Sequence, residues 1–322
     1  MVRIGVIGCG NIMRNAHIGP TLGDHPDVEL VAYYDVNREA AEGFAEDFGG
    51  EAVGSEREVC EASDAVYIAI PPNVHGEAET AALETGTHFF VEKPQALDLG
   101  FAREVAAEVE RQALITCVGY QWRHSPVGQT VREAVQAGTP VLANMFWYIG
   151  TPKLFFNRFK DRSGGQVVEQ VTHIVDTMRY AVGEIVEVFG WQHNVVHQGW
   201  EDWDNDDVGA ACVRFDNGAL GTITNCYALT EGAPTGSGAE VLCTDRRVHW
   251  QGRNVTIRTE DGEEKIPPFD GPPHRAEDLA FIEAIETGDP SGILSPYADG
   301  LKTLAVTLAC AKSGETGRPV EI

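Results

Sequence analysis

The chain has 322 residues, of which 43% are hydrophobic and 23% are charged, and its formal net charge is -25 at pH 7. This length can form two modest domains with separate cores, and the composition excludes a disordered or fibrous chain. Because so large a negative charge repels phosphate backbones, we expect neither nucleic acid nor an anionic membrane as a partner.

Membrane and disulfide signals are weak in this sequence. No apolar run approaches the ~20 residues that cross a bilayer, and the first residues form a strand-like segment instead of a signal peptide. The seven cysteines are scattered, without a Cys-x-x-Cys pair or a Cys/His cluster at zinc spacing. We therefore expect reduced thiols, a cytoplasmic location and no metal.

Short apolar runs alternate with amphipathic stretches up to about residue 119, which predicts βα units and a parallel sheet. Strands are expected at 2–7, 28–34, 64–70, 87–91 and 114–118. Apolar residues at helical spacing predict helices between them, for example at 38–48 and 73–85. We expect an α/β dinucleotide-binding domain over residues 1–119.

From about residue 141 the pattern changes to alternating stretches joined by turn residues, which indicates antiparallel hairpins of a large open sheet. The clearest strands are at 208–215, 219–229, 247–251 and 254–259. Helices are expected at 166–182, 275–287 and 297–313, before a short strand or tail at 319–322. We expect an α+β domain for substrate binding and oligomerisation over residues 120–322, whose C-terminal helix could pack back on the first domain.

Gly8-Cys9-Gly10 directly follow the first strand and precede a helical segment, as in the dinucleotide-binding fingerprint. Gly8 permits the tight turn, and Gly10 lets backbone N–H groups approach a pyrophosphate at the positive end of the helix. Met13 stands where a third glycine or alanine is expected, so helix–strand packing must be relaxed there. A glycine-rich turn in any βα unit is the alternative interpretation.

Asp35 ends the second strand, at roughly the distance expected for the acid that binds the adenosine ribose. A carboxylate there accepts hydrogen bonds from ribose hydroxyls and repels a 2′-phosphate, which favours NAD over NADP. Arg38 could partly neutralise such a phosphate, and Asp35 alone could instead be a helix N-cap.

Further motifs follow one another along nearly the whole chain. They are Ala69-Ile70-Pro71-Pro72-Asn73-Val74-His75, Val91-Glu92-Lys93-Pro94, Gly119-Tyr120-Gln121-Trp122-Arg123, Gly164-Gly165 with Glu169 and His173, Phe215-Asp216-Asn217-Gly218, and Ser313-Gly314-Glu315-Thr316-Gly317-Arg318-Pro319-Val320. With this ordered set the chain resembles the glucose-fructose oxidoreductase and inositol dehydrogenase family (Gfo/Idh/MocA). The resemblance implies a Rossmann domain, a second domain with a large open sheet, and a homodimer or homotetramer. It also implies NAD- or NADP-dependent oxidation or reduction of a secondary alcohol or aldehyde on a sugar, inositol or similar polyol.

Residue roles follow from the same resemblance. Lys93 corresponds to the active-site lysine, with a cis bond to Pro94, which restricts Lys93 to an extended conformation. Pro71 and Asn73 are implied along the nicotinamide half of the cofactor. The full set expected to contact the cofactor is Gly8, Gly10, Asn11, Ile12, Asp35, Arg38, Pro71, Asn73, His75, Glu92, Lys93 and Gln121.

Glu169, His173 and Asp176 differ by four and three positions, so on one α-helix they would form a single stripe. An alcohol donates hydride only as its hydroxyl proton leaves, which requires a base and a cation. We assign His173 as the base, Lys93 as the cation that polarises the oxygen, and Glu169 as the group that orients His173 or holds an adjacent hydroxyl. The family more often has Asp at the position of Glu169, and Lys93 and His173 could exchange roles. Glu169 and His173 could also be metal ligands, but no third ligand stands out. We interpret Asp176 as structural, a partner of Thr172 or Arg179 on the same helix face.

Tyr120, Trp122 and Arg123 are expected to line the substrate pocket, where aromatic faces suit the C–H faces of a sugar ring. Core packing is the alternative for Trp122. The basic segment 153–162, with Arg158, is either an exposed or intersubunit loop or binds an anionic group of the substrate. The acidic segment 200–207 is expected to be an exposed loop between strands, and the alternative is that its two tryptophans cap the pocket or an interface.

Three functions stay open at this stage. The favoured one is an NAD-dependent oxidoreductase acting on a secondary alcohol or ketone of a sugar, sugar acid or inositol-like polyol. The second is an NAD-dependent lyase or glycoside hydrolase that oxidises its substrate transiently at the same residues. The third is a cofactor-sensing binding protein without catalysis.

Overall fold

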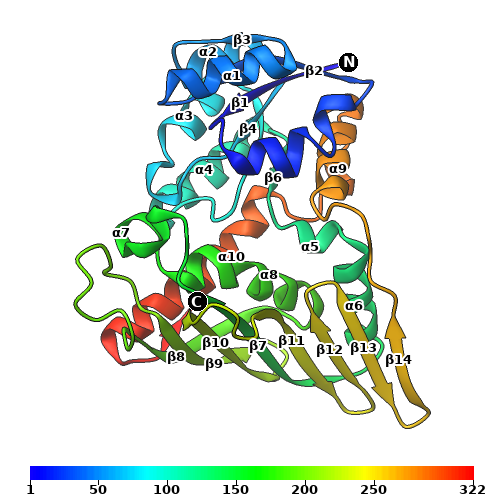
Figure 1. Ribbon diagram of the computed structural model, residues 1–322. Helices are drawn as coiled ribbons and strands as arrows, with labels where there is room; N and C mark the ends of the chain where they lie inside the picture. Colours follow the sequence, from blue (N-terminus) through cyan, green and yellow to red (C-terminus); the bar gives the residue numbers. More distant parts are fainter. The chain divides into compact units, whose positions relative to one another are not determined.

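The computed structural model describes residues 1–322, which form two compact units (Figure 1). Unit 1 comprises Met1–Ser125 and Gly271–Leu301, and unit 2 comprises Pro126–Asp270 and Lys302–Ile322. Helix α9 (Arg275–Thr287), which the sequence-based division left with the second domain, is part of unit 1. No helix in the chain combines the length and the apolar character needed to cross a membrane.

Unit 1 contains a parallel sheet of six strands. They are β1 (Val2–Ile7), β2 (Val28–Tyr34), β3 (Glu51–Ala52), β4 (Ala65–Ile68), β5 (His88–Val91) and β6 (Thr116–Val118). The strand order is β3-β2-β1-β4-β5-β6, and every neighbouring pair is parallel. This is the doubly wound order of dinucleotide-binding folds, in which the order reverses between β1 and β4. The predicted α/β class is confirmed.

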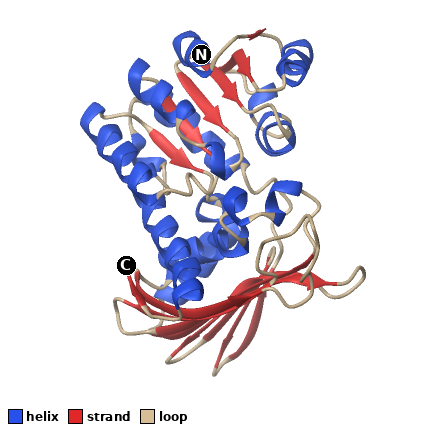
Figure 2. Ribbon diagram, turned by 90° about the vertical axis from the view of Figure 1, so that its left-hand side faces the viewer, coloured by secondary structure: helices blue, strands red, loops and turns tan.

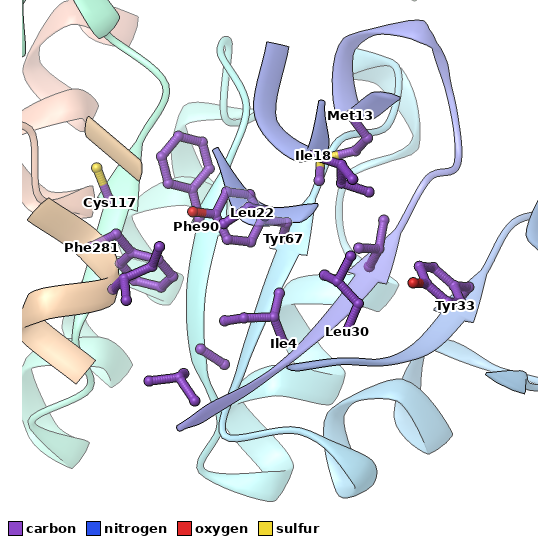
Figure 3. Packing of buried hydrophobic residues seen from close by; sticks show 14 of the residues in the cluster. Ile4, Met13, Ile18, Leu22, Leu30, Tyr33, Tyr67, Phe90, Cys117 and Phe281 are labelled. Atoms are coloured by element: carbon purple, nitrogen blue, oxygen red, sulfur yellow. The ribbon is translucent and has the colours of Figure 1, made fainter. Parts of the chain in front are cut away.

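The central strands β1 and β4 are buried on both faces, which explains their nearly continuous apolar sequences. Successive residues of β4 and β5 enter two different cores. Tyr67 and Phe90 pack in one core with Ile4 and Phe281, as Figure 3 shows. Phe89 packs in the other core. Each face of the sheet therefore needs helices to cover it.

The helices of unit 1 besides α9 are α1 (Arg38–Phe48), α2 (Glu56–Ala62), α3 (Glu77–Thr85), α4 (Leu99–Gln112) and α5 (Gln121–His124). The predicted helix at 73–85 starts later, because Gly76 with a φ of 143° and the Glu79 carboxylate, which accepts from the Gly76 N–H at 2.8 Å, cap α3. Pro72–Val74 form a 3₁₀ turn instead.

Unit 2 is built on a sheet of nine strands, which confirms the predicted large open sheet. They are β7 (Pro140–Gly150), β8 (Ile185–His193), β9 (Val208–Phe215), β10 (Leu220–Leu229), β11 (Gly236–Cys243), β12 (Arg247–Gln251), β13 (Asn254–Thr259), β14 (Gly262–Ile266) and β15 (Val320–Glu321). Their order is β14-β13-β12-β11-β7-β10-β9-β8-β15. Only the central pair β7 and β10 is parallel, so the sheet is mostly antiparallel.

Helices cover one face of this sheet (Figure 2). In unit 2 they are α6 (Pro126–Gln136), α7 (Lys160–Ser163), α8 (Thr172–Ala181) and the greater part of α10 (Tyr297–Thr316). Buried and partly exposed residues alternate along β10, as expected for a strand with one covered face.

Two helical segments contain π-helical turns where the sequence predicted ordinary helix. Met13–Ile18, after the glycine turn, is one, with the Gly19 N–H donating to the Arg14 carbonyl at 3.0 Å. Val167–Val171 is the other, so the predicted helix at 166–182 begins with a π-helical turn and becomes α-helical only at Thr172. Such turns occur frequently at functional sites.

Candidate active site

The glycine turn lies after β1, beside the end of β4, where the strand order reverses. Gly8 has a φ of +96°, and a Cβ there would lie 2.4 Å from the Ala69 carbonyl oxygen. Gly10 is exposed, and a Cβ there would have nothing within 4 Å. Gly8 is therefore required by the fold, whereas Gly10 leaves open space beside the backbone, as a pyrophosphate group requires.

Asp35 links the glycine turn to the end of β2. Its Oδ2 accepts a hydrogen bond from the Cys9 N–H at 2.8 Å, and its Oδ1 accepts one from the Asn37 N–H at 2.8 Å. Asn37, not Asp35, caps α1, so the alternative of Asp35 as an N-cap is wrong. Arg38 is exposed, and its Nε donates to Glu42 at 2.8 Å. The Asp35 carboxylate thus lies at the glycine turn, and the nearby Arg38 guanidinium is hydrogen-bonded to Glu42.

The remaining expected cofactor residues of this region differ in exposure. Asn11, Ile12, Pro71 and Asn73 are exposed at the ends of β1 and β4. In contrast, the His75 side chain is only 1% exposed, and its Nδ1 is hydrogen-bonded to the buried Glu79 carboxylate of α3. The His75 imidazole therefore contributes to the start of α3.

Lys93 follows β5, which ends at the same edge of the sheet as β1 and β4. The bond between Lys93 and Pro94 is cis, as the resemblance implied. Glu92 is buried, and its Oε2 accepts a hydrogen bond from the Lys93 N–H at 3.1 Å. The carboxylate of one residue therefore restrains the backbone of the next.

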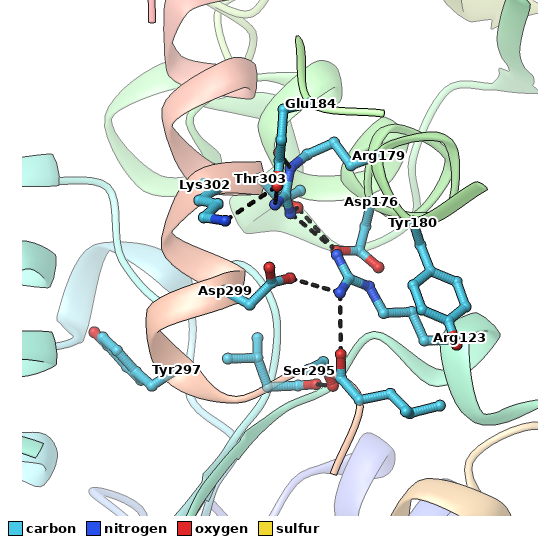
Figure 4. Close-up of polar contacts among 12 residues, drawn as sticks. Arg123, Asp176, Arg179, Tyr180, Glu184, Ser295, Tyr297, Asp299, Lys302 and Thr303 are labelled. Carbon is cyan, nitrogen blue, oxygen red and sulfur yellow. Dashed lines mark hydrogen bonds and ion pairs between the residues drawn. The ribbon is translucent and has the colours of Figure 1, made fainter. Parts of the chain in front are cut away.

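Residues 120–123 begin α5 at the end of β6. Tyr120, Gln121 and Arg123 are buried, and Trp122 is partly exposed. The Arg123 Nη1 donates to the Leu294 carbonyl at 3.0 Å and pairs with the Asp299 carboxylate, as Figure 4 shows. Arg123 therefore ties α5 to the segment 294–299 within unit 1, a contact that the sequence did not indicate.

Glu169 and His173 lie on consecutive helical segments of unit 2, Glu169 in the π-helical turn and His173 in α8. Their exposed fractions are 9% and 8%. The His173 ring is stacked near Trp147 of β7, with centroids 6.0 Å apart and an interplanar angle of 24°. Burial and the negative charge of Glu169 raise the pKa of the Tyr227 phenol on β10. The structure thus places an imidazole and a carboxylate on consecutive helical segments, and the carboxylate acts electrostatically on a fully buried tyrosine.

Sequence reasoning missed Trp147 and Tyr227. Both are in strands whose alternation predicts only which face each residue occupies, and nothing in that pattern relates them to the helix. The π-helical turn at Glu169 was also missed, because its extra residue has no sequence signal.

Comparisons with known proteins bear on the whole chain. Residues 2–120 match the family described as "Oxidoreductase family, NAD-binding Rossmann fold", and residues 129–249 match the "GFO/IDH/MocA C-terminal domain". The chain belongs to the Gfo/Idh/MocA oxidoreductase family.

Relatives in the family are similar over their full length. The 1,5-anhydro-D-fructose reductase of Ensifer adhaerens is 28% identical over 100% of this chain and 99% of its own. The myo-inositol 2-dehydrogenase of Thermotoga maritima is 28% identical over 100% of this chain and 98% of its own. A crystal structure described as a "probable dehydrogenase" from Thermotoga maritima has 26% identity and a TM-score of 0.82, and covers 99% of this chain and 98% of that one.

In this Gfo/Idh/MocA chain, Asp176 is part of a buried polar group in unit 2. Its Oδ1 accepts from the Thr303 hydroxyl at 2.8 Å and lies 3.7 Å from the Arg179 guanidinium, which also pairs with Glu184 at 2.8 Å (Figure 4). As expected, Asp176 is a structural partner of Arg179.

The basic and acidic segments contact each other. Arg158 pairs with Asp202, and the Lys160 Nζ lies 2.7 Å from Asp206 Oδ2. Two of the four cations of segment 153–162, Arg158 and Lys160, therefore already face carboxylates of this chain.

The prediction that 200–207 is an exposed loop is wrong at its end. Trp203 is 6% exposed and Asp207 is 0% exposed, although Trp200 is 46% exposed. The Asp207 carboxylate accepts hydrogen bonds from the N–H groups of residues 195, 196 and 197, at 2.8, 2.7 and 3.0 Å. Burial opposes ionisation, but these N–H groups and His197 hold the pKa of Asp207 below its usual value. Asp207 therefore organises the segment around itself.

Proposed function

We propose that this chain is an NAD-dependent oxidoreductase that acts on a secondary alcohol or ketone of a sugar, sugar acid or inositol-like polyol. The observation that carries the proposal is the Asp35 carboxylate, fixed by the Cys9 N–H at the glycine turn. The names of the relatives, a reductase of an anhydro sugar and a dehydrogenase of an inositol, support the substrate class. We also propose a homodimer or homotetramer, as the resemblance implies.

The residues at the glycine turn fit a dinucleotide. The open space at Gly10 can receive the pyrophosphate, and Asp35 can accept hydrogen bonds from the adenosine ribose. The Asp35 carboxylate would repel a 2′-phosphate, and the Arg38 guanidinium, which forms an exposed ion pair with Glu42, offsets this repulsion only in part. NAD is therefore the proposed cofactor; when bound, its nicotinamide accepts or returns hydride.

We assign proton transfer to His173, whose imidazole accepts the proton of the substrate hydroxyl and returns it in the reverse direction. The stacked Trp147 ring restricts the plane of this imidazole. Glu169 holds a neighbouring hydroxyl or supports the protonated imidazole. The ammonium of Lys93 stabilises the negative charge that develops on the substrate oxygen as the proton leaves.

A panel of sugars, inositols and sugar acids, tested with NAD and with NADP and followed by nicotinamide absorbance, tests the proposal. We expect NADH to accumulate with at least one compound, with kcat/KM at least about tenfold higher for NAD than for NADP. Preference for NADP would overturn the role of Asp35. Cleavage of a substrate without net NADH would indicate the lyase or hydrolase chemistry instead.

Two substitutions test the residue roles with the same assay. Lys93→Ala and His173→Ala are each expected to lower kcat by about 10²- to 10⁴-fold, and in His173→Ala the Kd for NAD should change little. Asp161→Asn, an exposed substitution in the basic segment, is the control and is expected to leave kcat unchanged. Wild-type kcat in either alanine variant would contradict the assignment.

A further inference from the structure

A buried histidine of unit 1, His17, lies between two carboxylates from distant parts of the chain. It belongs to the π-helical segment that follows the glycine turn, and it is 0% exposed. Its Nδ1 lies 2.7 Å from Asp278 Oδ1 on α9, and its Nε2 lies 3.0 Å from Glu92 Oε1 at the end of β5. Both ring nitrogens are thus engaged by carboxylate oxygens.

This geometry determines the protonation state of the ring. A neutral imidazole has one N–H, so its other nitrogen would present a lone pair to a carboxylate oxygen. An imidazolium donates from both nitrogens. Burial alone lowers the pKa of His17, but Asp278 and Glu92 outweigh it and raise that pKa well above its usual value. His17 therefore carries the positive charge between two negative groups.

The charge of His17 lies among apolar aromatic rings. The rings of Tyr67 and Phe90 pack against His17, with centroids 5.4 and 5.2 Å away. In such an apolar environment ionic hydrogen bonds are strong, and a carboxylate that loses its partner is costly.

Other titratable groups lie near His17, Glu92 and Asp278, which together form the His17 cluster. The Tyr67 hydroxyl donates to Asp278 Oδ1 at 3.2 Å, and the His274 ring centroid is 5.4 Å from that of His17. Burial lowers the pKa of His274, and this outweighs the nearby carboxylates. Glu277 is buried next to Asp278, and Lys93 is adjacent to Glu92. His274 is therefore neutral near pH 7 and leaves His17 as the buried cation of the cluster.

Glu92 connects this cluster to the active-site lysine. Its Oε1 is held by His17, and its Oε2 accepts from the Lys93 N–H at 3.1 Å. The neighbouring Gly119 has no side chain, and a Cβ there would lie 2.6 Å from Glu92 Oε1. The carboxylate is therefore confined to one position by its hydrogen bonds and by the backbone around it.

We propose that His17 is a positioning residue whose imidazolium, through Glu92, fixes the backbone of Lys93 and couples it to the dinucleotide-binding turn. The proposal rests on the proposed function of Lys93. His17 touches neither substrate nor reacting atoms; it acts through Glu92. Asp278 completes the arrangement by anchoring the ring to α9.

The first test needs no substrate. In the full chain with ¹⁵N-labelled histidine, we expect both His17 ring nitrogens to carry protons at pH 8, where exposed histidines are neutral. His17→Gln identifies its signals by their loss. One protonated nitrogen at pH 8 would overturn the proposal.

The second test reads the lysine backbone directly. The chain has six lysines, so ¹⁵N-lysine labelling gives few amide signals, and Lys93→Arg identifies that of Lys93. We expect His17→Gln to shift the Lys93 amide and His25→Gln, a matched substitution outside the cluster, to leave it unchanged. An unshifted Lys93 amide in His17→Gln would overturn the coupling.

The third test uses turnover and NAD binding. His17→Gln is expected to lower kcat at least about tenfold, because it leaves two buried carboxylates without their cation. Glu92→Gln in the same chain removes one of these charges, so the double variant is expected to recover part of the lost kcat. A double variant whose loss equals the product of the two single losses would contradict an interaction between the residues.

The outcomes separate this proposal from the proposed function. If the wild-type chain turns over no polyol, the proposed function fails, yet the two spectroscopic tests still decide the role of His17. If His17→Gln does not fold, Asp278→Asn identifies the His17 imidazole signals by shifting them, and an unshifted Lys93 amide in Glu92→Gln would overturn the coupling. The proposal for His17 would also be overturned if the purified chain held one equivalent of a divalent cation and its removal by a chelator shifted the Lys93 amide signal. The cation, and not His17, would then balance the charge of the carboxylates.

Discussion

Replacing each of the two glycines of the dinucleotide turn by alanine tests two different properties: Gly8→Ala tests the stability of unit 1, and Gly10→Ala tests cofactor binding. In Gly8→Ala, a left-handed φ of +96° costs an alanine about 1–2 kcal/mol. The new Cβ would also lie 2.4 Å from the Ala69 carbonyl oxygen and 2.9 Å from the Ile70 Cγ2. Such overpacking costs about 1–3 kcal/mol. We therefore expect a total loss of about 2–5 kcal/mol in the free energy of unfolding of unit 1.

Gly10→Ala is the matched control. Nothing lies within 4 Å of its added Cβ, and its φ is not positive, so the free energy of unfolding should change by no more than about 0.5 kcal/mol. The methyl group would occupy the space proposed for the pyrophosphate. We expect the Kd for NAD to rise at least about tenfold, which corresponds to 1.4 kcal/mol of binding free energy.

Urea unfolding measures the free energy of unfolding, and hydrogen exchange of the β1 amides reports on unit 1 in particular. Calorimetric titration with NAD measures the Kd. Equal stabilities of Gly8→Ala and Gly10→Ala would refute the packing argument. Wild-type affinity for NAD in Gly10→Ala would refute the proposed place of the pyrophosphate.

Three further predictions concern charged groups. Because folding raises the pKa of His17, the stability contributed by its protonated ring is complete below the ordinary pKa of about 6.5 and is lost as the pH rises through the raised value. In urea unfolding, the difference in free energy of unfolding between wild type and His17→Gln should therefore shrink from pH 6 to pH 10. A constant difference would contradict this. Asp207→Asn should lose about 2–4 kcal/mol in the same assay while Glu201→Gln, in the same segment, changes it by less than about 0.5 kcal/mol. Arg158→Ala, which removes a partly exposed ion pair with Asp202, should cost at most about 1 kcal/mol and leave the KM for a sugar acid unchanged; a large rise in KM would restore Arg158 as a substrate ligand.

The sequence determined the fold class and most of its elements. β1, β2 and α1 have the bounds that apolar periodicity predicted, because a parallel strand buried on both faces needs an apolar run, and an amphipathic helix needs one apolar stripe. Gly8 and Asp35 were also found from sequence. Their positions relative to β1 and β2 follow from local chain geometry, which a short motif can encode.

The tertiary structure alone decided the contacts between distant segments. His17 and Asp278 are 261 positions apart, and His17 and Glu92 are 75 apart, so no local pattern relates them. The same is true of Arg158 with Asp202. The π-helical turn at Glu169 belongs here as well, because local propensity hardly distinguishes it from an α-helical turn.

The glycine turn shows both contributions at one place. The sequence predicted that Gly8 and Gly10 form the turn and that Asp35 follows at the next strand. Only the folded chain shows that Asp35 accepts a hydrogen bond from Cys9 and that the segment beginning at Met13 carries His17 to the carboxylate beside Lys93. The physical reason is that burial and hydrogen bonding depend on which segments meet, and those meetings are decided by the packing of the whole unit.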